Sequence, residues 1–477
     1  MKKLFTFLAV ICLAMNARAQ YQVANSDFEK WTASSGEPDH WHGFKSAKGS
    51  LAGLAKGTLA SSTDVRDGVS GKSAVITAGS VFGIVNNGTF TTGQLQAGNM
   101  SAANTANHAE MDKGSDATDK NGDKFYMPLT GHPDAVKVWI KFSQAKPNSQ
   151  HPYASANAVI FDGSYYQDPE DKTYTNKVAM AKNATITTCD WTEFTIPFDY
   201  ESYKYNEGVA NYNNSGGAIL VTFGTNADAG QGSSGDEVYV DDMVLVYNHD
   251  LASVVYDGTN VTVAPSMDLS DQYYDESKLA LTHNAKGNAT IDDSNYNKAT
   301  GLLTITVKGE NYGEETETDY ASMFKDNTSK STYTIQFKPY EAELLSLTYD
   351  GKSLPLDAAN MTEAVITGPF DDTKLSYTQS DYATVQVNDY FEEERVLSLD
   401  VTSKDGGASN TYEIQLYYKG DVNNDGSVTI ADVTSLVNII LGKTTDYKEA
   451  IADVNGDGSV TIADVTALVN IILGKQN

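Results

Sequence analysis

The sequence is nearly free of cysteine and poor in basic residues. Cys12 and Cys189 are the only cysteines in 477 residues. The first lies in an N-terminal segment that we expect to be removed, so the mature chain cannot form an internal disulfide and must gain stability from core burial and bound metal. Lys and Arg number 34 against 63 Asp and Glu, which gives a formal net charge of −29. Because nucleic-acid binding depends on basic patches, we expect no nucleic-acid partner.

No apolar run after the first segment approaches the roughly 18 residues that a membrane span needs, so we expect no span. Residues 1–19 contain two lysines, an apolar run and the small-residue site Ala17–Ala19, which is the pattern of a secretory signal peptide cleaved before Gln20. The residue before Cys12 is not small, which argues against lipidation. Without the two lysines and Arg18, the chain has 34 − 3 = 31 basic residues and a net charge of 31 − 63 = −32. We expect an exported, soluble protein.

Familiar catalytic motifs are also missing. The sequence has no G-x-S-x-G, H-E-x-x-H or glycine-rich phosphate loop. His40 and His42 form an H-x-H pair without a third ligand, and we expect them to be structural. Glycoside hydrolysis needs two carboxylates about 5–10 Å apart, and 63 acidic residues offer no way to choose a pair. The sequence therefore nominates no catalytic residue, and it favours a non-catalytic protein without deciding the matter.

The C-terminus is a tandem repeat. Residues 421–443 read DVNNDGSVTIADVTSLVNIILGK and residues 453–475 read DVNGDGSVTIADVTALVNIILGK, so the copies begin 453 − 421 = 32 residues apart. A repeat this close indicates one structural unit used twice. The copies differ at two pairs of positions: Asn424 and Gly456, and Ser435 and Ala467.

Each copy begins with a loop that can wrap a hard cation. Side-chain oxygens stand at loop positions one, three and five, a glycine permits the sharp turn at six, and a backbone carbonyl is available at seven. A hydroxyl at nine can hold a water, and an aspartate stands at twelve where the EF-hand motif has glutamate. The sequence therefore predicts one Ca²⁺ in each loop. The expected ligands are Asp421, Asn423, Asp425, Ser427, Thr429 and Asp432 in the first loop, and Asp453, Asn455, Asp457, Ser459, Thr461 and Asp464 in the second.

An amphipathic helix is expected after each loop, and no entering helix is expected before either. The apolar residues of the first copy have the i, i+3, i+4, i+7, i+8 spacing of one helix face, and Gly442 follows as a helix stop. These residues are Val433, Leu436, Val437, Ile440 and Leu441.

This layout resembles the type I dockerin family over residues 420–477. The resemblance implies two calcium ions and docking onto a cohesin-type protein partner. In that family loop positions ten and eleven help to choose the partner, and here they are Ile430-Ala431 and Ile462-Ala463, which implies an apolar recognition surface. Asn438 and Asn470 stand where clostridial dockerins often carry basic residues, which argues against a clostridial type of partner. The alternative is a calcium-stapled tail that only resists proteolysis.

The region from Tyr21 to Asn248 shows strand patterns and no sustained helical period. Many short strands in about 230 residues predict a two-sheet jelly roll. The clearest strands are expected at Val136–Phe142, Asn157–Phe161, Thr192–Phe198, Ala218–Phe223 and Glu237–Tyr247.

Residues 20–248 also resemble a known family in the order of their motifs. NSDFEKW (Asn25–Trp31) and PDHWHGF (Pro38–Phe44) stand near the start, and VYVDDMVLVY (Val238–Tyr247) stands near the end. With PLTGHPDAVKVWIKFS and DWTEFTIPFDY between them, they resemble the “putative carbohydrate metabolism domain” of exported gut Bacteroidetes proteins. The resemblance implies a carbohydrate-related jelly roll in polysaccharide catabolism, secreted by or held on the surface of a Gram-negative bacterium. By this resemblance, the tryptophans expected in the core are Trp31, Trp41 and Trp191.

Two further β-domains are expected, at residues 249–339 and 340–419. Their size and all-strand character predict immunoglobulin-like sandwiches, each opening on a hairpin with an Asp-Gly turn, and we expect them to be spacers. The repeated stretches are Leu251–Gly258 with Leu344–Gly351, and Ser331–Phe337 with Asn410–Leu416. The whole chain is thus predicted to be mainly β: a jelly-roll β-sandwich, two immunoglobulin-like β-sandwiches and a small α-helical dockerin with paired EF-hand-like loops.

One strand face in the N-terminal region has the composition of a sugar-binding platform. Alternation puts Trp139 between Lys137 and Lys141 on a polar face, where the ring can stack on a pyranose and the ammonium groups can reach its hydroxyls. The alternative is a tryptophan covered by a loop, since this residue is usually well buried. Tyr165 and Tyr166, in a loop with Asp162 and Asp168, can extend the platform.

Glu29, near the first strand, and Asp241 or Asp242, in the last, can meet at the sandwich edge and hold a further structural calcium ion, as jelly-roll carbohydrate modules often do. The favoured function is an exported multimodular glycan-binding protein linked to polysaccharide utilisation. The alternatives are a polysaccharide-degrading glycoside hydrolase or lyase that carries a dockerin, and a structural or adhesive surface protein.

Overall fold

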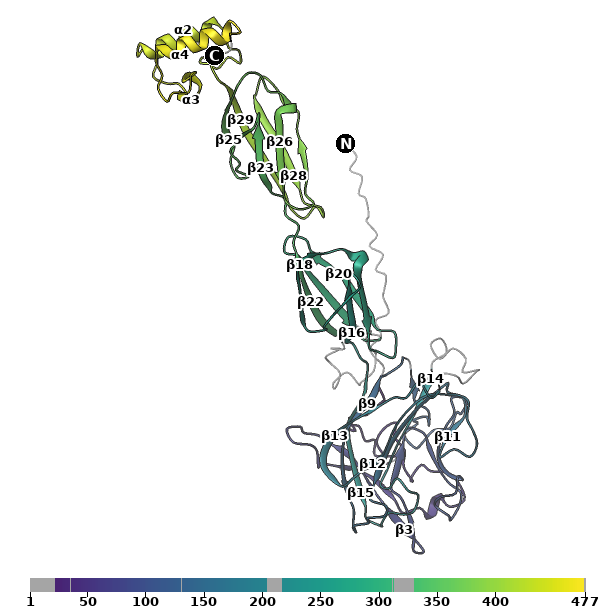
Figure 1. The fold of residues 1–477 in the computed structure, drawn as a ribbon. Coiled ribbons are helices and arrows are strands. Elements are labelled where there is room, and N and C mark those ends of the chain that lie inside the picture. The colour runs from purple at the N-terminus through teal and green to yellow at the C-terminus, as the bar shows by residue number, and fades with distance from the viewer. Residues whose placement is uncertain are drawn as a thin grey trace, which may run out of the picture. The chain divides into compact units, whose positions relative to one another are not determined.

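The computed structural model describes residues 22–34, 36–129, 131–203, 217–310, 312 and 330–475. The expected signal peptide, with its cleavage site before Gln20, lies outside these residues. The chain divides into two compact units, and Figure 1 shows their strands and helices. The first unit comprises Met1–Val263, Ala280–Asp292 and Thr306–Thr332, and the second comprises Ala264–Leu279, Asp293–Ile305 and Tyr333–Asn477.

The N-terminal region contains two main antiparallel sheets, in agreement with the predicted sandwich. The order of the first is β1-β2-β15-β9-β13, and the order of the second is β12-β10-β14-β5, with β8 also paired to β14. The first comprises β1 (Thr58–Ser62), β2 (Ser73–Thr77), β15 (Glu237–Val246), β9 (Ala135–Ser143) and β13 (Cys189–Pro197). The second comprises β12 (Lys177–Ile186), β10 (Ala154–Phe161), β14 (Gly217–Gly224), β5 (Thr89–Thr91) and β8 (Pro128–Leu129). The five strands expected from the sequence correspond to β9, β10, β13, β14 and β15.

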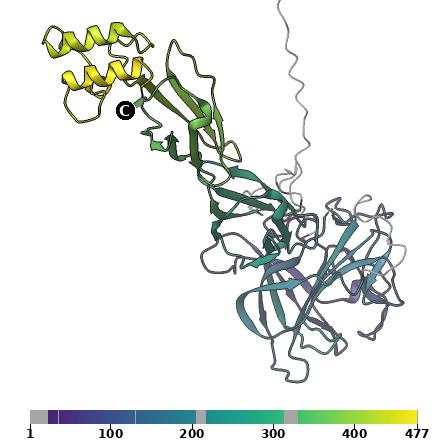
Figure 2. The same ribbon diagram turned by 45° about the horizontal axis from the view of Figure 1, so that its top comes forward.

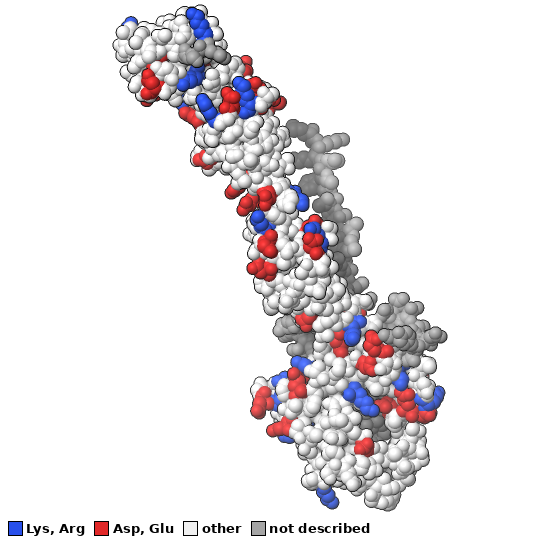
Figure 3. Space-filling view, in the orientation of Figure 1, with Lys and Arg blue, Asp and Glu red and all other residues white. Residues whose placement is uncertain are grey.

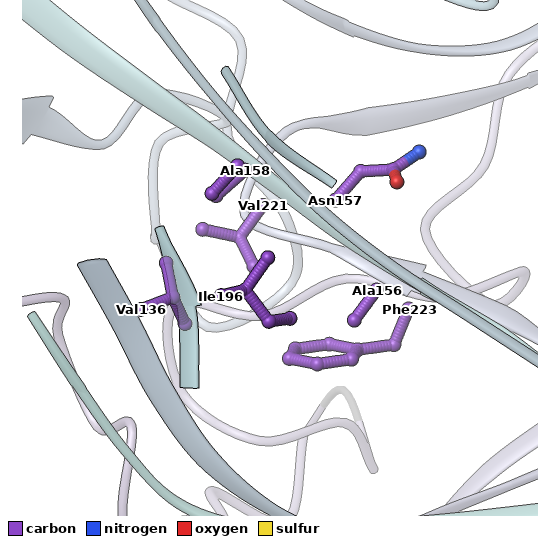
Figure 4. A pocket seen from close by; sticks show the side chains of 8 residues that line it. Val136, Ala156, Asn157, Ala158, Ile196, Val221 and Phe223 are labelled. Carbon is purple, nitrogen blue, oxygen red and sulfur yellow. The ribbon is translucent and has the colours of Figure 1, made fainter. Parts of the chain in front are cut away.

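Strand alternation decides which face of each sheet is buried. In β9 the alternate residues from Val136 to Phe142 are buried, and the residues between them are half-buried. Trp41 is fully buried in the core, with its ring 5.2 Å from that of Phe28 and 5.3 Å from that of Phe90. A cavity of about 10 Å³ lies between the sheets, lined by Val136, Phe223 and six other residues (Figure 4). This volume holds about one water molecule, so this cavity is a packing defect rather than a ligand site.

Smaller elements complete this region. A three-stranded sheet has the order β11-β7-β6, and β3 pairs with β4 as a hairpin. These elements are β11 (Tyr166–Asp168), β7 (Asn107–Met111), β6 (Gln94–Ala97), β3 (Gly79–Val81), β4 (Ile84–Asn86) and the 3₁₀ turn η1 (Ala52–Leu54).

The next two regions repeat one strand plan, as the internal sequence repeats predict. Each has a three-stranded sheet, β17-β16-β19 or β24-β23-β26, and a four-stranded sheet, β18-β22-β21-β20 or β25-β29-β28-β27. The repeated stretches fall in equivalent strands, and Asp257 and Asp350 have φ of 47° and 49° in the expected Asp-Gly turns. In both copies one pair is parallel, β18 with β22 and β25 with β29.

The elements of the first copy are β16 (Leu251–Tyr256), β17 (Thr259–Val261), β18 (Ser266–Tyr273), η2 (Glu276–Lys278), β19 (Leu279–His283), β20 (Thr290–Asn297), β21 (Leu302–Lys308) and β22 (Lys330–Lys338). Those of the second are β23 (Leu344–Tyr349), β24 (Lys352–Ser353), β25 (Thr362–Ile366), η3 (Asp372–Lys374), β26 (Leu375–Gln379), β27 (Thr384–Val387), β28 (Val396–Thr402) and β29 (Ser409–Tyr418). The boundary between the two compact units passes through the first copy.

The tail contains α2 (Ile430–Ile440), α3 (Glu449–Ala452) and α4 (Ile462–Ile472). The equivalent helices α2 and α4 lie side by side (Figure 2) and share an apolar core around Leu436 and Leu468. The sequence-based expectation of no helix before either loop is wrong for the second loop, because the one-turn helix α3 ends directly before it. Ile451 and Ala452 of α3 are buried in the tail, and this tertiary burial stabilises a turn too short to show a sequence period.

Within the described residues, none of the helices combines the length and the apolar character that crossing a membrane requires. Acidic and basic side chains are interspersed over the face shown in Figure 3, and the lysines and arginines of the described residues form no continuous patch on that face.

Candidate functional sites

The predicted polar face of β9 is present on the outside of the first sheet. Lys137, Trp139 and Lys141 are half-buried and alternate with buried apolar residues. Trp139 stands opposite Glu193 of β13 on one side and Asp241 of β15 on the other. Both cross-strand neighbours of Trp139 are therefore acidic. The sequence alone could not predict this, because it does not give the register between the strands.

Arg66, in the connection between β1 and β2, covers the ring of Trp139. The guanidinium carbon lies 5.0 Å from the ring centroid, which is the geometry of a cation–π contact. The Nε of Arg66 also donates to an Asp242 carboxylate oxygen at 3.0 Å. The alternative that Trp139 is covered is thus partly realised, by one charged side chain rather than by an apolar loop.

Lys141 lies in a second cluster of interacting side chains on this face. Its ammonium lies 2.9 Å from an Asp64 oxygen, and the other Asp64 oxygen accepts from the indole N–H of Trp191 at 3.0 Å. These two hydrogen bonds lower the pKa of the Asp64 carboxyl. Trp191 lies edge-on to Tyr239, with ring centroids 6.3 Å apart. The expectation that Trp191 packs in the core is wrong: a register shift in β13 between Cys189 and Thr192 accompanies its outward position. Trp31, in contrast, packs against the core.

The expected extension by two tyrosines is not met. Tyr166 is fully buried, because it begins β11 and its ring lies 5.4 Å from that of Phe161 in the core. Tyr165 is 38% exposed, and its hydroxyl donates to Glu110 at 3.0 Å. Tyr166 belongs to a different sheet from Trp139, and Tyr165 lies in the bend just before that strand.

A pocket of about 320 Å³ adjoins this face. It is lined by Asp27, Glu29, Arg66, Val69, Ser70, Asp241 and Asp242, so the structure brings together the three acidic residues that were expected to meet. Burial and the neighbouring Asp242 charge raise the pKa of Asp241 to about 7, and burial raises the pKa of Asp27. Arg66 is the cation among the residues that line this pocket. The sequence analysis did not identify it, because it belongs to no periodic pattern.

His42 is fully buried, in agreement with the structural role expected for the H-x-H pair. Its Nδ1 lies 3.8 Å from an oxygen of Asp119, and that of His40 lies 3.4 Å from Asp123. Burial lowers the pKa of His42 to about 4, so its imidazole is neutral near pH 7. The two aspartates come from a loop about eighty residues further along the chain, and for this reason the sequence did not show them.

The first predicted calcium loop is closed by its own backbone. Asp421 and Asp432 are buried, at 1% and 0% exposure. The N–H groups of Asp425 and Gly426 donate to Asp421 at 3.0 and 2.9 Å, and that of Asn423 donates to Asp432 at 3.1 Å. The carboxylates at positions one and twelve are therefore each held by backbone amides of the loop itself.

The second loop repeats this pattern with Asp453, Asn455, Asp457 and Asp464. Thr429 and Thr461 cap α2 and α4, since each hydroxyl accepts from the N–H two residues on, at 3.2 Å. Over the described ranges no three His, Cys, Asp or Glu side chains are already gathered at metal-holding spacing, but these loops also offer amide, hydroxyl and carbonyl oxygens. Because calcium takes six to eight oxygen ligands, the donor set fits calcium.

The apolar pairs at loop positions ten and eleven lie on the surface. Ile430 and Ile462 are 70% and 69% exposed, and Leu441 and Leu473 are 61% and 60% exposed. The prediction that Ile440 and Leu441 belong to the buried helix face is therefore wrong, and Ile439 is buried instead. Two equivalent apolar surfaces result, one in each copy.

Comparison with known proteins identifies the tail. Residues 419–473 match the model of the dockerin type I domain, so the repeat is a type I dockerin domain, a protein-docking module of a kind that binds calcium. None of the curated proteins matches the chain.

Solved structures match weakly. One is described as a “putative glycoside hydrolase” from Bacteroides thetaiotaomicron VPI-5482, with 14% identity, a TM-score of 0.36, and coverage of 49% of this chain and 72% of that one. Another, with the same description, is from Bacteroides vulgatus ATCC 8482, with 18% identity, a TM-score of 0.29, and coverage of 39% and 76%.

Proposed function

We propose that this chain, with its C-terminal dockerin type I domain, is an exported glycan-binding protein that docks onto a cohesin-type partner in a calcium-dependent manner. In this proposal residues 1–19 direct export, residues 20–248 contact a polysaccharide, and residues 249–339 and 340–419 are spacers. Residues 420–477 are the docking domain.

The observation that carries the proposal is the duplicated loop-helix unit with an exposed isoleucine in each copy. Ile430 and Ile462 occupy equivalent positions at the start of α2 and α4 and remain about 70% exposed. A large apolar side chain that stays exposed in both copies of a protein-docking module suits a partner interface. Ala431 and Ala463, beside them, are also exposed and leave room for a partner chain to approach.

The calcium ions are assigned to the two loops. We assign the ligands to the oxygens of Asp421, Asn423, Asp425, Ser427, Thr429 and Asp432, and of Asp453, Asn455, Asp457, Ser459, Thr461 and Asp464. Bound calcium supplies the positive charge that closes each loop on its carboxylates. The capping hydrogen bonds of Thr429 and Thr461 hold position nine close to the start of each helix, where a water can bridge to the ion. A third ion beside Glu29, Asp241 and Asp242 stays a prediction.

The glycan site is placed at the pocket beside Trp139. Support comes from a pocket of about 320 Å³ that the Arg66 guanidinium and several carboxylates line, and from the Trp139 ring beside it, which the same guanidinium covers. Sugars are bound by aromatic faces together with planar polar groups that hydrogen-bond their hydroxyls. In this arrangement Lys137 and Lys141 flank the ring, but each is engaged with an acidic residue, Glu193 at 3.1 Å and Asp64 at 2.9 Å.

The test is binding of the purified full-length chain to a broad polysaccharide panel, with reducing-sugar release followed in the same wells. We expect binding without release, and Trp139→Ala should weaken it at least about tenfold. The matched control is Tyr165→Ala, which removes a partly exposed ring from the bend before β11. If Trp139→Ala leaves binding to every glycan unchanged, the site is elsewhere.

A second candidate, a glycoside hydrolase or lyase, is favoured by one observation in the same pocket. Asp241 has a pKa raised to about 7, while Asp242 is paired with Arg66. Glycosidases need one protonated and one ionised carboxyl group. Release of reducing ends that disappears in both Asp241→Asn and Asp242→Asn would establish this function in place of simple binding.

A further inference from the structure

The two calcium loops are almost identical in sequence but have different surroundings. The position-one carboxylate of the first loop, Asp421, bonds to Arg395 of the preceding β-region, with Nη1 to Oδ2 at 2.8 Å. The Nη2 of Arg395 donates to the carbonyl of Asn424, loop position four, at 3.1 Å. Arg395 thus binds the first loop through two hydrogen bonds.

Arg395 is held in place from behind. It is 9% exposed, its guanidinium lies 5.8 Å from the ring of Tyr418, and its own backbone is tied to Phe391 and Leu416 at 2.8 Å each. Its φ of 54° is a left-handed conformation that a long side chain seldom adopts. The contacts of the guanidinium with Tyr418, Asp421 and Asn424 together hold it in this position.

The second loop has no such hydrogen-bonded partner among the described residues, although the Lys419 ammonium lies beside it, 3.4 Å from where a Cβ on Gly456 would stand. Asp453 accepts from the N–H groups of Gly456, Asp457 and Gly458, and among the described residues no cation pairs with it. Loop position four is Gly456 in this copy, the one difference within the loops. Asp453 is half-exposed, whereas Asp421 is buried.

These surroundings have opposite effects with and without calcium. In the metal-free chain, Arg395 is the counter-ion of a buried carboxylate that is otherwise costly to leave unpaired. When calcium enters, the guanidinium charge lies on one of its ligands and opposes the ion. The Lys419 ammonium beside Gly456 forms no hydrogen bond with a described ligand of the second loop and therefore opposes the ion there less. We propose that Arg395 is a built-in counter-ion that makes the two calcium sites inequivalent, so that the second loop fills at lower calcium and the first loop stays attached to the β-region without metal.

This inference rests on the proposed calcium binding of both loops. It assigns a positioning role to Arg395, which acts through Asp421. It also means that the last β-region is part of the dockerin's calcium response rather than a passive spacer.

The test uses calorimetric calcium titration of full-length chains with one active loop. Asp464→Ala leaves the first loop and Asp432→Ala leaves the second, each with and without Arg395→Gln. We expect the first loop to bind calcium at least about fivefold more weakly than the second, and Arg395→Gln to raise the affinity of the first loop by a similar factor. The second loop should change less than about twofold, which makes it the matched control. Equal affinities, or a first loop indifferent to Arg395→Gln, would overturn the inference.

A second measurement avoids the ligand substitutions in case they unfold the tail. In the otherwise unaltered chain, the amide NMR signals of Gly426 and Gly458, at position six of each loop, report the filling of each site separately. Gly458 should shift at lower calcium than Gly426, and the two should move together in Arg395→Gln. Two glycines that already shift together in the unaltered chain contradict the role of Arg395. No shift and no heat at either loop would instead refute calcium binding itself.

Discussion

The outer face of the first sheet and the surface of the dockerin domain differ in whether their large side chains are covered by charged neighbours or left exposed. On the sheet, Arg66 covers Trp139 and Asp64 engages Lys141, so the partners of this face come from the same unit. On the tail, Ile430 and Ile462 stand about 70% exposed, and no described side chain is seen to cover them in the way that Arg66 covers Trp139. This difference fits the proposal that the tail, a dockerin type I domain, presents its apolar side chains to another protein.

Removing calcium should separate the two regions most clearly. We expect excess chelator to abolish the helical circular-dichroism signal of α4 and most of that of α2, because the folding of so small a unit is coupled to its metal. The β-signal should persist, since both predicted loops, at residues 421–432 and 453–464, lie outside the β-regions. The signal should return on adding calcium, but not in a chain carrying both Asp432→Ala and Asp464→Ala. A tail that stays helical in chelator would refute this dependence.

Acid, in contrast, should lower the stability of the N-terminal sandwich. The folded-state pKa of His42 is lowered from 6.5 to about 4, so the unfolded chain takes up a proton at this residue in a range where the folded chain does not. The stability contribution is therefore fully present above about pH 6.5 and is lost as the pH falls toward 4. The loss should reach about 3 kcal/mol.

Thermal unfolding of the β-signal between pH 7 and 4.5 measures this loss. His42→Gln should flatten the pH dependence, whatever its own cost in stability, and His151→Gln, at a partly exposed pair with Asp228, should not. If His42→Gln retains the full slope, another group is responsible.

The open apolar pairs predict a difference between single and double substitution. Ile430→Asp or Ile462→Asp alone leaves the other copy intact and should weaken binding to a cohesin-type protein by no more than about tenfold. The double substitution should abolish measurable binding, because a charge is placed in each apolar contact. Both side chains are exposed, so the helical signal with calcium should not change. Tyr447→Asp, which is 40% exposed between the two copies, is the control, and equal loss in this control would discount the isoleucines.

The parts that the sequence could predict are those governed by local period and repetition. Alternation from Val136 to Phe142 sufficed to place β9, and the duplicated D-x-N-x-D-G loops sufficed to identify the dockerin domain. The parts it could not predict depend on residues far apart in the chain. Arg66 reaches Trp139 and Arg395 reaches Asp421 through the fold alone, and a register shift in β13 places Trp191 on the outside. The prediction for Tyr166 was wrong because this residue begins β11 and is buried, whereas Tyr165 lies in the bend before the strand and is partly exposed.

The smallest expected effect tests whether Arg66 blocks access to the Trp139 ring or itself binds the sugar. Arg66→Ala removes the guanidinium over Trp139 and leaves Asp242 without its cation. If the ring is the platform and Arg66 only covers it, glycan binding should strengthen by about threefold, in keeping with the modest strength of an exposed cation–π contact. If Arg66 instead donates to the sugar, binding should weaken by a comparable or larger factor. Arg66→Lys distinguishes the two roles, because it keeps the charge but loses the planar pair of donors. Tryptophan fluorescence with an uncharged quencher gives an independent reading, since quenching should rise in Arg66→Ala only if the ring is truly covered.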